Sequence, residues 1–460
     1  MHDYAALSYW LEDVGALDPR PSLDGSTSCD VAVVGAGFSG LWTAYYLLRN
    51  DPSLNVVVLE REIAGFGGSG RNAGWCNATM LGVTPRALTK KYGAAGAREM
   101  LEMLRSRIGA VQEACSSEGI DAHFRHSGVL RIARGRHELP ALATKWDELE
   151  ALGLADGIVR LDRDETRARI DVQGAEAGLF DPNVAWVHPG RLVRGLAEAV
   201  ERHGGTVYER TPVTAVEPGP RPRVTTSTGV VEARNVVLAS EAYTTQLPGS
   251  HRRLIPLYSL VVLTEPLSPA QWAEIGWDGG EGLSSCCLTV DYLSRTHDGR
   301  ILFGGRGAPY HYGSRIDGTF DRHRATHDRL RGHLVSWFPS LADVRITHEW
   351  GGPLGVPRDW MPNVFHDRTA GVAGAFGYTG QGVAMSNLAG QALADRLTEK
   401  DTRVSRLPLI DHRSRNWEPE PLRWTAVRAL QASLFRTDAR GERTGRPPSG
   451  WSIAERLTSH

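Results

Sequence analysis

A glycine cluster that joins an apolar segment to a helical one constrains the fold more than any other feature. The pattern GAGFSG at 35–40 follows directly on residues 29–34, an apolar run of β type, and opens a helical segment at 40–49. A second apolar strand follows at 55–60. A strand, a glycine turn, a helix and a strand within about 30 residues form a βαβ unit, which implies a parallel sheet. We therefore expect an α/β fold.

The spacing of these glycines, with the acid that follows them, predicts a dinucleotide site. Gly35 makes the tight turn, Gly37 lets the backbone approach a pyrophosphate, and Gly40 lets helix and strand pack closely. The helix N-terminus offers free N–H groups and the positive end of its dipole to the phosphates. Glu60 ends the second strand and can accept a hydrogen bond from a ribose 2′-OH. The alternative is an ordinary glycine-rich turn, which the combination of strand, helix and terminal acid disfavours. We assign to the same cofactor site Phe38, Ser39 and Arg61.

A second glycine cluster lies at 65–74, just beyond Glu60. Its backbone can approach a flat ligand closely, and its arginine and asparagine offer donors to a phosphate or a ring. A nicotinamide-binding domain would place a helix here, so the loop indicates a longer cofactor such as FAD, with a flexible surface loop as the alternative. The residues of this cluster assigned to the cofactor are Gly67, Gly68, Ser69, Arg71, Asn72, Ala73 and Gly74.

A third glycine cluster at 374–382 feeds a helical segment at 383–397. A helix N-terminus beside the flavin ring would stabilise negative charge on that ring. No βαβ unit follows, which disfavours a second dinucleotide fold. The cofactor residues assigned here are Gly377, Tyr378, Gly380, Gln381, Gly382 and Val383, joined by Val213 and Ala239 from two earlier strands.

Helical and strand-like segments alternate without a repeat between these clusters. Helical periodicity marks 86–118, 140–152, 191–203 and 321–338. Strand patterns mark 126–133, 206–208, 213–216, 222–227, 235–240, 254–264 and 300–305. This mixture predicts an α/β core interrupted by an α+β insertion.

Composition excludes several classes of protein. The 460 residues carry 52 basic and 53 acidic side chains, so no nucleic-acid surface is expected. No run of about eighteen apolar residues predicts a membrane helix, and no leader is recognised. Five cysteines without a CxxC pair favour a reduced cytoplasm and argue against a metal site. Lys accounts for only four of the basic residues, a bias typical of a GC-rich bacterial genome.

Six motifs, in order along nearly the whole chain, resemble the FAD-dependent D-amino-acid oxidase (DAO) superfamily and its γ-glutamylputrescine oxidoreductase branch. They are VAVVGAGFSGLWTAYYL, GGSGRNAG, VHPGRLVRGLAEAV, GRILFGGRG, GYTGQGVAMSNLAGQ and NWEPEPLRW. The resemblance implies a Rossmann-type FAD-binding domain of the glutathione-reductase kind, with an inserted substrate domain built on a mixed antiparallel sheet. The expected FAD-binding parts are 1–85, 156–245 and 345–400, the substrate-binding parts are 86–155 and 246–344, and 401–460 is a C-terminal extension.

The resemblance also implies a reaction: a hydride passes from the carbon beside an amine nitrogen to flavin N5, and the imine then hydrolyses. O2 is the expected electron acceptor, with a dehydrogenase using another acceptor as the alternative. A flavin monooxygenase or halogenase would show Gly-Asp where this chain has Ala-Ser-Glu-Ala at 239–242. An NAD(P)H-linked reductase would need a second GxGxxG unit. A non-catalytic flavin-binding scaffold stays open.

Three departures from sarcosine-oxidising relatives bear on the site. Their flavin-linking Cys is absent from the matching residues 349–352, so we expect non-covalent FAD. Their two active-site lysines fall on Ala384 and on 302–303. Because the chain has only four lysines, we expect no Lys to fill these roles, and we expect Arg to recognise any carboxylate.

The resemblance places candidate catalytic residues on two strands. Tyr258 would orient the amine, with interstrand packing as the alternative. Arg306 would pair with a carboxylate, with an ordinary surface position as the alternative, which its flanking glycines disfavour. The predicted pocket also includes Trp75, His188 and Trp350, for which core packing and helix capping are the alternatives. A polyamine, a secondary amino acid and a biosynthetic intermediate all fit as substrate, and either a monomer or a homodimer is expected.

Overall fold

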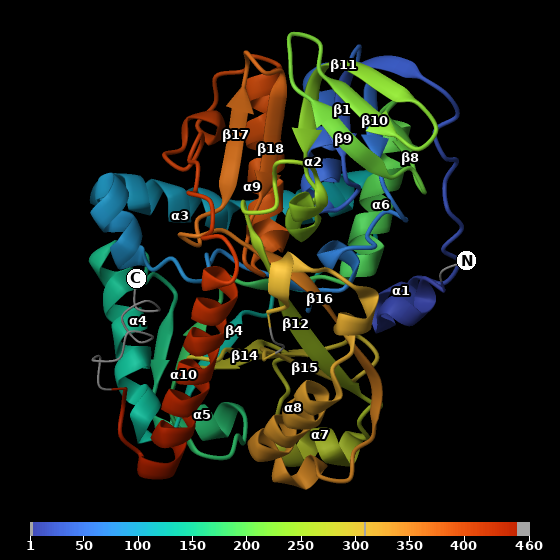
Figure 1. The fold of residues 1–460 in the computed structure, drawn as a ribbon. Coiled ribbons are helices and arrows are strands. Elements are labelled where there is room, and N and C mark those ends of the chain that lie inside the picture. Colours follow the sequence, from blue (N-terminus) through green and yellow to red (C-terminus); the bar gives the residue numbers. More distant parts are fainter. Residues whose placement is uncertain (1–2, 308–309, 449–460) are drawn as a thin grey trace.

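The computed structural model describes residues 3–307 and 310–448, apart from the Arg306 side chain. Two mixed sheets dominate these residues, one in the upper and one in the lower half of Figure 1. Helices pack against both sheets, so the predicted combination of an α/β part with an α+β part is confirmed.

The first sheet is built on parallel strands and carries the βαβ unit. Its order is β17-β18-β11-β1-β2-β8, with β10 pairing β11 and β9 pairing β10. Its strands are β1 (Thr27–Val34), β2 (Val56–Leu59), β8 (Thr206–Tyr208), β9 (Val213–Glu217), β10 (Arg223–Thr226), β11 (Val230–Leu238), β17 (Asn363–Asp367) and β18 (Val372–Phe376).

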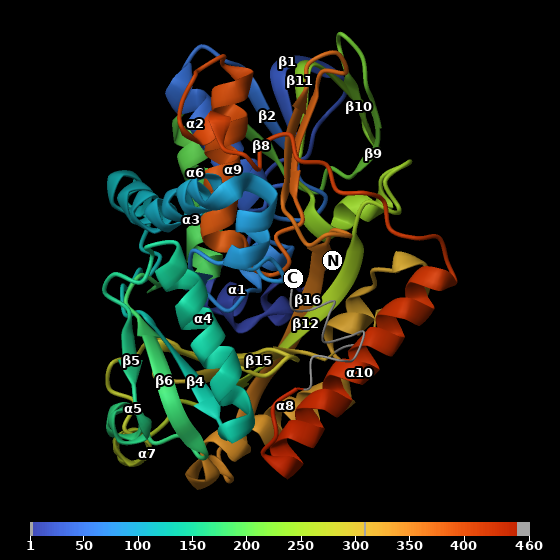
Figure 2. The ribbon, with the colours of Figure 1, turned by 90° about the vertical axis from the view of Figure 1, so that its left-hand side faces the viewer.

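Three helices cover one face of this sheet: α2 (Phe38–Asn50), α6 (Pro189–Arg202) and α9 (Gly382–Leu397). Helix α3 (Pro85–Glu118) packs on the outer side of this helix layer, against α9 and α6, as Figure 2 shows. Side chains of β1 alternate between two cores. Val31 and Val33 pack against the helices, whereas Ala32 and Val34 join the apolar cluster on the other face. Both faces of β1 are therefore buried, as expected for a central parallel strand.

The second sheet has the order β16-β12-β15-β14-β13-β4-β6-β5. Its pairs are antiparallel except that β13 and β4 run parallel. Its strands are β4 (Val129–Arg134), β5 (Val159–Leu161), β6 (Ala175–Asp181), β12 (Ile255–Thr264), β13 (Gly282–Ser285), β14 (Asp291–Arg295), β15 (Ile301–Arg306) and β16 (Ile346–Val356). Helices of this half are α4 (Leu139–Ala151), α5 (Arg163–Arg169), α7 (Pro269–Ile275) and α8 (Arg324–Trp337).

The sheet pairing differs from the expected division of the chain at two places. Strands β5 and β6 were expected with the FAD-binding part, but they pair with β4 in the second sheet. Strand β16, likewise expected with the FAD-binding part, pairs with β12 from Ile255 to Thr264. Strand partners are chosen by contacts distant in sequence, which local patterns do not reveal. The division into two domains itself stays a prediction.

Several expected elements have shifted ends. Strand β11 begins at Val230 rather than 235, because its first residues pair with β10 in a hairpin. The helix expected from 321 begins at Arg324, after a 3-10 turn over Gly318–Asp321. Helix α3 has the expected extent but breaks at Gly93, whose φ is +74°.

The C-terminal segment touches both halves of the molecule. The amide of Asp411 donates to Val364 O beside the first sheet. The carboxylate of Asp438, on α10 (Leu422–Thr444), accepts hydrogen bonds from the amides of Leu288 and Thr289. Figure 2 shows α10 lying along the lower half, near α8. The segment therefore forms hydrogen bonds with both halves of the molecule.

Membrane-spanning helices and metal-binding clusters are both absent from the described residues. None of their helices combines the length and apolarity that crossing a lipid bilayer requires. In the same part of the chain, no group of three or more His, Cys, Asp or Glu side chains has an arrangement able to hold a metal ion.

Candidate functional site

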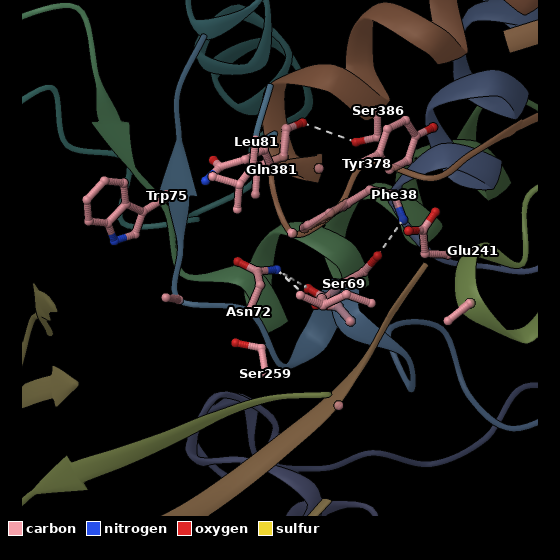
Figure 3. A pocket seen from close by; sticks show the side chains of 18 of the residues that line it. Phe38, Ser69, Asn72, Trp75, Leu81, Glu241, Ser259, Tyr378, Gln381 and Ser386 are labelled. Atoms are coloured by element: carbon pink, nitrogen blue, oxygen red, sulfur yellow. Dashed lines mark hydrogen bonds between the residues drawn. The ribbon is translucent and has the colours of Figure 1, made fainter. Parts of the chain in front are cut away.

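A cavity of about 670 Å³ lies where the first sheet meets the second. Its wall includes the turn between β1 and α2, the 67–73 loop and the start of α9. Strands β12 and β14 and helix α4 complete it. Figure 3 shows side chains from the start of α2, the 67–73 loop, β12 and the region near the start of α9 around one space. Segments far apart in sequence thus form a single site.

The glycines of the first cluster are required by close contacts. Gly35 has a φ of +106°, and a Cβ there would meet Ala239 O at 2.8 Å. A Cβ at Gly40 would run into the carbonyl oxygen of Gly35. Gly37 is the N-cap of α2 and offers no side-chain cap. The N-cap residue therefore places no side chain between the start of α2 and the cavity, which suits an anionic ligand such as a pyrophosphate.

Glu60 lies on the cavity wall just after β2. Its carboxylate accepts hydrogen bonds from the amides of Ala36 at 2.8 Å and Glu62 at 3.0 Å. Burial raises its pKa, and those two bonds oppose the shift. The geometry leaves the carboxylate beside the glycine turn, where the sequence predicted a ribose contact.

The loop of the second cluster is fixed by its own polar side chains. Ser69 Oγ accepts a hydrogen bond from the Phe38 amide at 2.8 Å, which ties the loop to the start of α2, as Figure 3 shows. The Asn72 amide group donates to the carbonyls of Gly68 and Ser69. The loop is therefore held in shape before any ligand binds.

Arg71 has its guanidinium engaged by the protein. It forms an ion pair with Asp321 at 2.5 Å and donates to Tyr243 Oη at 3.0 Å and to Gly351 O at 3.2 Å. Its side chain is only 2% exposed. Arg71 therefore connects the loop to the second half of the molecule, although it also lines the cavity.

The third cluster is anchored by Glu241, which the sequence reasoning missed. Its carboxylate accepts hydrogen bonds from the amides of Gly377 at 2.7 Å and Gly355 at 3.1 Å. Burial raises its pKa to about 7. Its φ of +46° is unusual for a residue with a side chain. In the sequence, the only signal at this position was that flavin monooxygenases and halogenases carry Gly-Asp in the matching segment.

The structure brings most of the predicted cofactor residues onto one wall. Those that line the cavity are Gly35, Gly37, Phe38, Ser39, Glu60, Arg61, Gly67, Gly68, Ser69, Arg71, Asn72, Ala73, Val213, Ala239, Tyr378, Gly380, Gln381, Gly382 and Val383. Gly40, Gly74 and Gly377 lie behind the wall, where a Cβ would meet Gly35, Val187 and Pro357 respectively. Their binding of a cofactor stays a prediction.

Tyr258 does not line the cavity. It is 1% exposed and packs in the core of the second half, where its hydroxyl bonds to the backbone of Asp317. Its neighbours Ser259 and Val261 line the cavity instead. Successive side chains of a strand point to opposite faces, so Tyr258 faces the core while Ser259 faces the cavity.

Two of the three predicted pocket residues also lie elsewhere. Trp350 is buried against other aromatic side chains, and its Nε1 donates to Arg71 O. His188 caps α6, where its Nδ1 accepts from the Arg191 amide. Both therefore serve packing and capping, the alternatives stated above. Trp75 does line the cavity, as Figure 3 shows.

Arg306 can be placed only by its backbone. It ends β15, opposite Ser259 of β12. Its side chain lies outside the described residues, so its carboxylate role stays a prediction.

Lys145 lines the cavity from α4, which the sequence reasoning did not anticipate. Arg131, on β4, lines it as well. Lys145 follows Leu142 by three residues and precedes Leu149 by four. It therefore shares their face of the helix, a periodicity that could have revealed it from the sequence.

Comparisons with known proteins identify what the chain is similar to. A family model described as FAD dependent oxidoreductase (DAO) matches residues 30–396. Gamma-glutamylputrescine oxidoreductase of Escherichia coli K12 is 29% identical over 408 residues, which cover 88% of this chain and 92% of that protein. A probable oxidoreductase OrdL of Rhizobium meliloti is 29% identical over 84% of this chain and 87% of that protein.

The fold is similar to that of a solved amino-acid-oxidising enzyme. A crystal structure of glycine oxidase from Geobacillus kaustophilus superposes with a TM-score of 0.70 at 20% sequence identity. The match covers 84% of this chain and 99% of that one.

Proposed function

This chain belongs to the DAO family of FAD-dependent oxidoreductases, and we propose on that premise that it oxidises the C–N bond of an amine or amino acid and passes the electrons to O2. The resemblance and the FAD cofactor predicted from the sequence are confirmed by the family match. The proposal is supported by the names of two relatives, gamma-glutamylputrescine oxidoreductase and glycine oxidase.

The observation that carries the proposal is the fit of the cavity to FAD. Two helices, α2 and α9, begin at the cavity wall, and neither N-cap residue forms a side-chain cap hydrogen bond. Such helix ends favour anionic groups. The turn at Gly35 admits no side chain, and Gly68 has open space where a Cβ would stand. Gly37, Glu60, Ser69 and Gly382 are the residues that would hold the cofactor.

When bound, FAD supplies the two-electron acceptor for a hydride from the carbon beside the amine nitrogen. The residues of this chain position the amine and exclude water. Trp75, Val261 and Tyr292 give the cavity an apolar and aromatic wall in the second half of the molecule. Ser259 Oγ lies 2.9 Å from Tyr292 Oη, which fixes both hydroxyls on that wall. Such a wall favours an uncharged amine over an ammonium ion.

We propose that FAD is bound without a covalent link. Cys286 and Cys287 line the cavity, which the sequence reasoning did not expect of them. Burial raises the pKa of Cys286 to about 12 and that of Cys287 well above its usual range. The thiolate is the nucleophilic form of cysteine, so these thiols are poorly suited to attack a flavin ring. Release of yellow FAD into the supernatant after acid denaturation tests this point.

Anaerobic mixing with a panel of amines tests the reaction. The panel contains γ-glutamylputrescine, putrescine, sarcosine, glycine and proline, and the signal is the flavin absorbance. We expect at least one member to bleach the flavin, and readmitted O2 to restore the colour with release of H2O2. If no member bleaches it, the proposed oxidation is wrong.

A dithionite-reduced sample serves as the control for oxygen reactivity, because it bypasses the substrate. Bleaching by an amine, followed by recovery only with an artificial acceptor, would replace the oxidase by the dehydrogenase alternative.

A further inference from the structure

Two cationic side chains in the cavity wall form no hydrogen bond or ion pair within the described residues. Arg131 extends from β4 and Lys145 from α4, and both line the large cavity. Both side chains are half-buried. This contrasts with Arg71 on the same wall, whose guanidinium is paired with Asp321.

The fold directs both cations to the same place. On β4, Leu130 and Ile132 point into the core of the second half, so Arg131 points to the opposite face, together with Ala133. Ala133 packs in the apolar cluster that contains Leu142 of α4. Lys145 lies one turn after Leu142 on that side of the helix. The two positive charges therefore meet between β4 and α4.

The two charges influence each other. Burial and the positive charge of Arg131 lower the pKa of Lys145 to about 8. Both cations also influence the Cys286 thiol nearby. A smaller cavity of about 70 Å³ is lined by Arg131, Lys145 and Trp75 as well. Room for a substituent thus exists beside the charges.

The acidic side chains that face this region are hydrogen-bonded to other groups, and Glu148 and Asp181 attract Lys145 without pairing with it. The Glu148 carboxylate bonds to Thr84, and that of Glu138 accepts from the amides of Arg134 and Cys286. Asp181 Oδ1 accepts from Asn183. Asp291 Oδ1 accepts from Ser285 in the same way. None of the four forms an ion pair with Arg131 or Lys145 within the described chain.

We propose that Arg131 and Lys145 form a subsite that binds a carboxylate of the substrate. Two like charges held together in a partly desolvated cavity repel each other, and a bound anion relieves that repulsion. The guanidinium can bind a carboxylate through two parallel hydrogen bonds, and the ammonium adds a third. The inference rests on the proposed function and narrows it: the amine that is oxidised carries a carboxylate.

Binding of non-reacting carboxylates tests the subsite without turnover. The probes are acetate, propionate and glutarate, titrated into the FAD-loaded protein by calorimetry, with glutaramide as the neutral counterpart of glutarate. We expect a carboxylate to bind and glutaramide not to bind. Arg131→Gln and Lys145→Gln should each raise the Kd at least about tenfold. Failure of all three carboxylates to bind the wild-type protein, or equal Kd values in the variants, overturns the proposal.

Matched variants separate this role from a general loss of structure. Lys90→Gln makes the same chemical change on an exposed part of α3 outside the cavity, and it should bind as the wild type does. Lys145→Arg keeps the charge and should retain binding. The wild-type affinity should fall as pH rises through about 8, because Lys145 loses its proton there. Lys145→Arg should remove that fall, since arginine stays charged. An unchanged pH profile in Lys145→Arg would contradict the role of Lys145.

Kinetics then distinguish failure of the subsite from failure of the proposed function. With any amine that bleaches the flavin, Arg131→Gln and Lys145→Gln should raise KM for the carboxylate form at least about tenfold and leave KM for its carboxamide unchanged. Equal effects on both forms would overturn the subsite while the amine oxidation stands. Bleaching by no amine would overturn the oxidation, while the calorimetric titration still reports on the subsite.

Discussion

Tyr378 Oη lies 2.8 Å from Ser39 Oγ, so one hydrogen bond joins the first turn of α2 to the loop that leads into α9. Both side chains are buried and both line the cavity. The two segments that begin the α2 and α9 helices are therefore held at a fixed separation across the proposed cofactor site.

Removing this hydrogen bond from either partner should destabilise the folded protein. We expect Tyr378→Phe and Ser39→Ala each to lower the free energy of unfolding by about 1 kcal/mol, because a buried hydrogen bond is lost. The double variant should cost less than the sum of the two, since it removes the same bond. Urea unfolding of all four proteins measures this coupling, and strictly additive losses would argue against the bond.

Gly35→Ala should prevent proper folding of the cofactor turn. The new Cβ would lie 2.8 Å from Ala239 O, at a φ that side chains rarely adopt. We expect a large loss of bound FAD, measured by flavin absorbance per protein. Gly109→Ala is the matched control, because nothing lies within 4 Å of a Cβ there. Equal FAD content in the two variants would show that the turn tolerates a side chain.

Arg71→Gln should destabilise the protein even without FAD. Its removal leaves the Asp321 carboxylate largely buried and unpaired, which costs on the order of 3 kcal/mol. Asp321→Asn should cost a similar amount for the converse reason. Urea unfolding of the FAD-free proteins is the measurement. A loss seen only in the presence of FAD would instead make Arg71 a direct cofactor ligand.

Glu241 should make stability depend on pH. Its pKa rises from 4.5 to about 7 on folding, so the folded state binds the extra proton between those values. That contribution is present below pH 4.5 and is lost as pH rises through about 7. Relative to Glu241→Gln, the wild type should lose roughly 3 kcal/mol across this window. Unfolding measured at several pH values tests the sign, and a wild type that gains stability relative to Glu241→Gln as pH rises would contradict it.

Tyr258→Phe should leave catalysis nearly unchanged, because the ring packs away from the cavity. We expect kcat and KM within about twofold of wild type, and a loss of about 1 kcal/mol in unfolding from the bond to Asp317. Ser259→Ala, one residue further on the cavity face, is the comparison, and it should alter KM. A large fall in kcat for Tyr258→Phe would return this residue to the reaction.

Local chemistry made the cofactor side of the site predictable. The turn at Gly35 needs a positive φ and admits no Cβ, so glycine itself marks that turn in the sequence. Glu60 directly follows the short apolar strand β2, so its position is also visible in the sequence. The start of α9 was found for the same reason. Each of these features depends on residues that lie within about ten positions of one another, and little on the rest of the fold.

The substrate side depended on contacts that no short pattern contains. Tyr258 was chosen from a strand whose phase relative to the cavity is set by its partners β15 and β16. Lys145 was not considered for the site because the chain has few lysines, although it lies on the side of α4 that faces Arg131. Glu241 gained its role only when Gly355 and Gly377 folded around it.

The bond between Ser39 and Tyr378 spans 339 residues of sequence, and this distance has a consequence for biosynthesis. On the ribosome, the first βαβ unit emerges long before α9 is made. The cofactor pocket therefore cannot close on a nascent chain, and loading of FAD must follow release or the last stages of translation. A pool of free FAD should then favour recovery of the finished chain, because a ligand that binds only the folded state shifts the balance toward it.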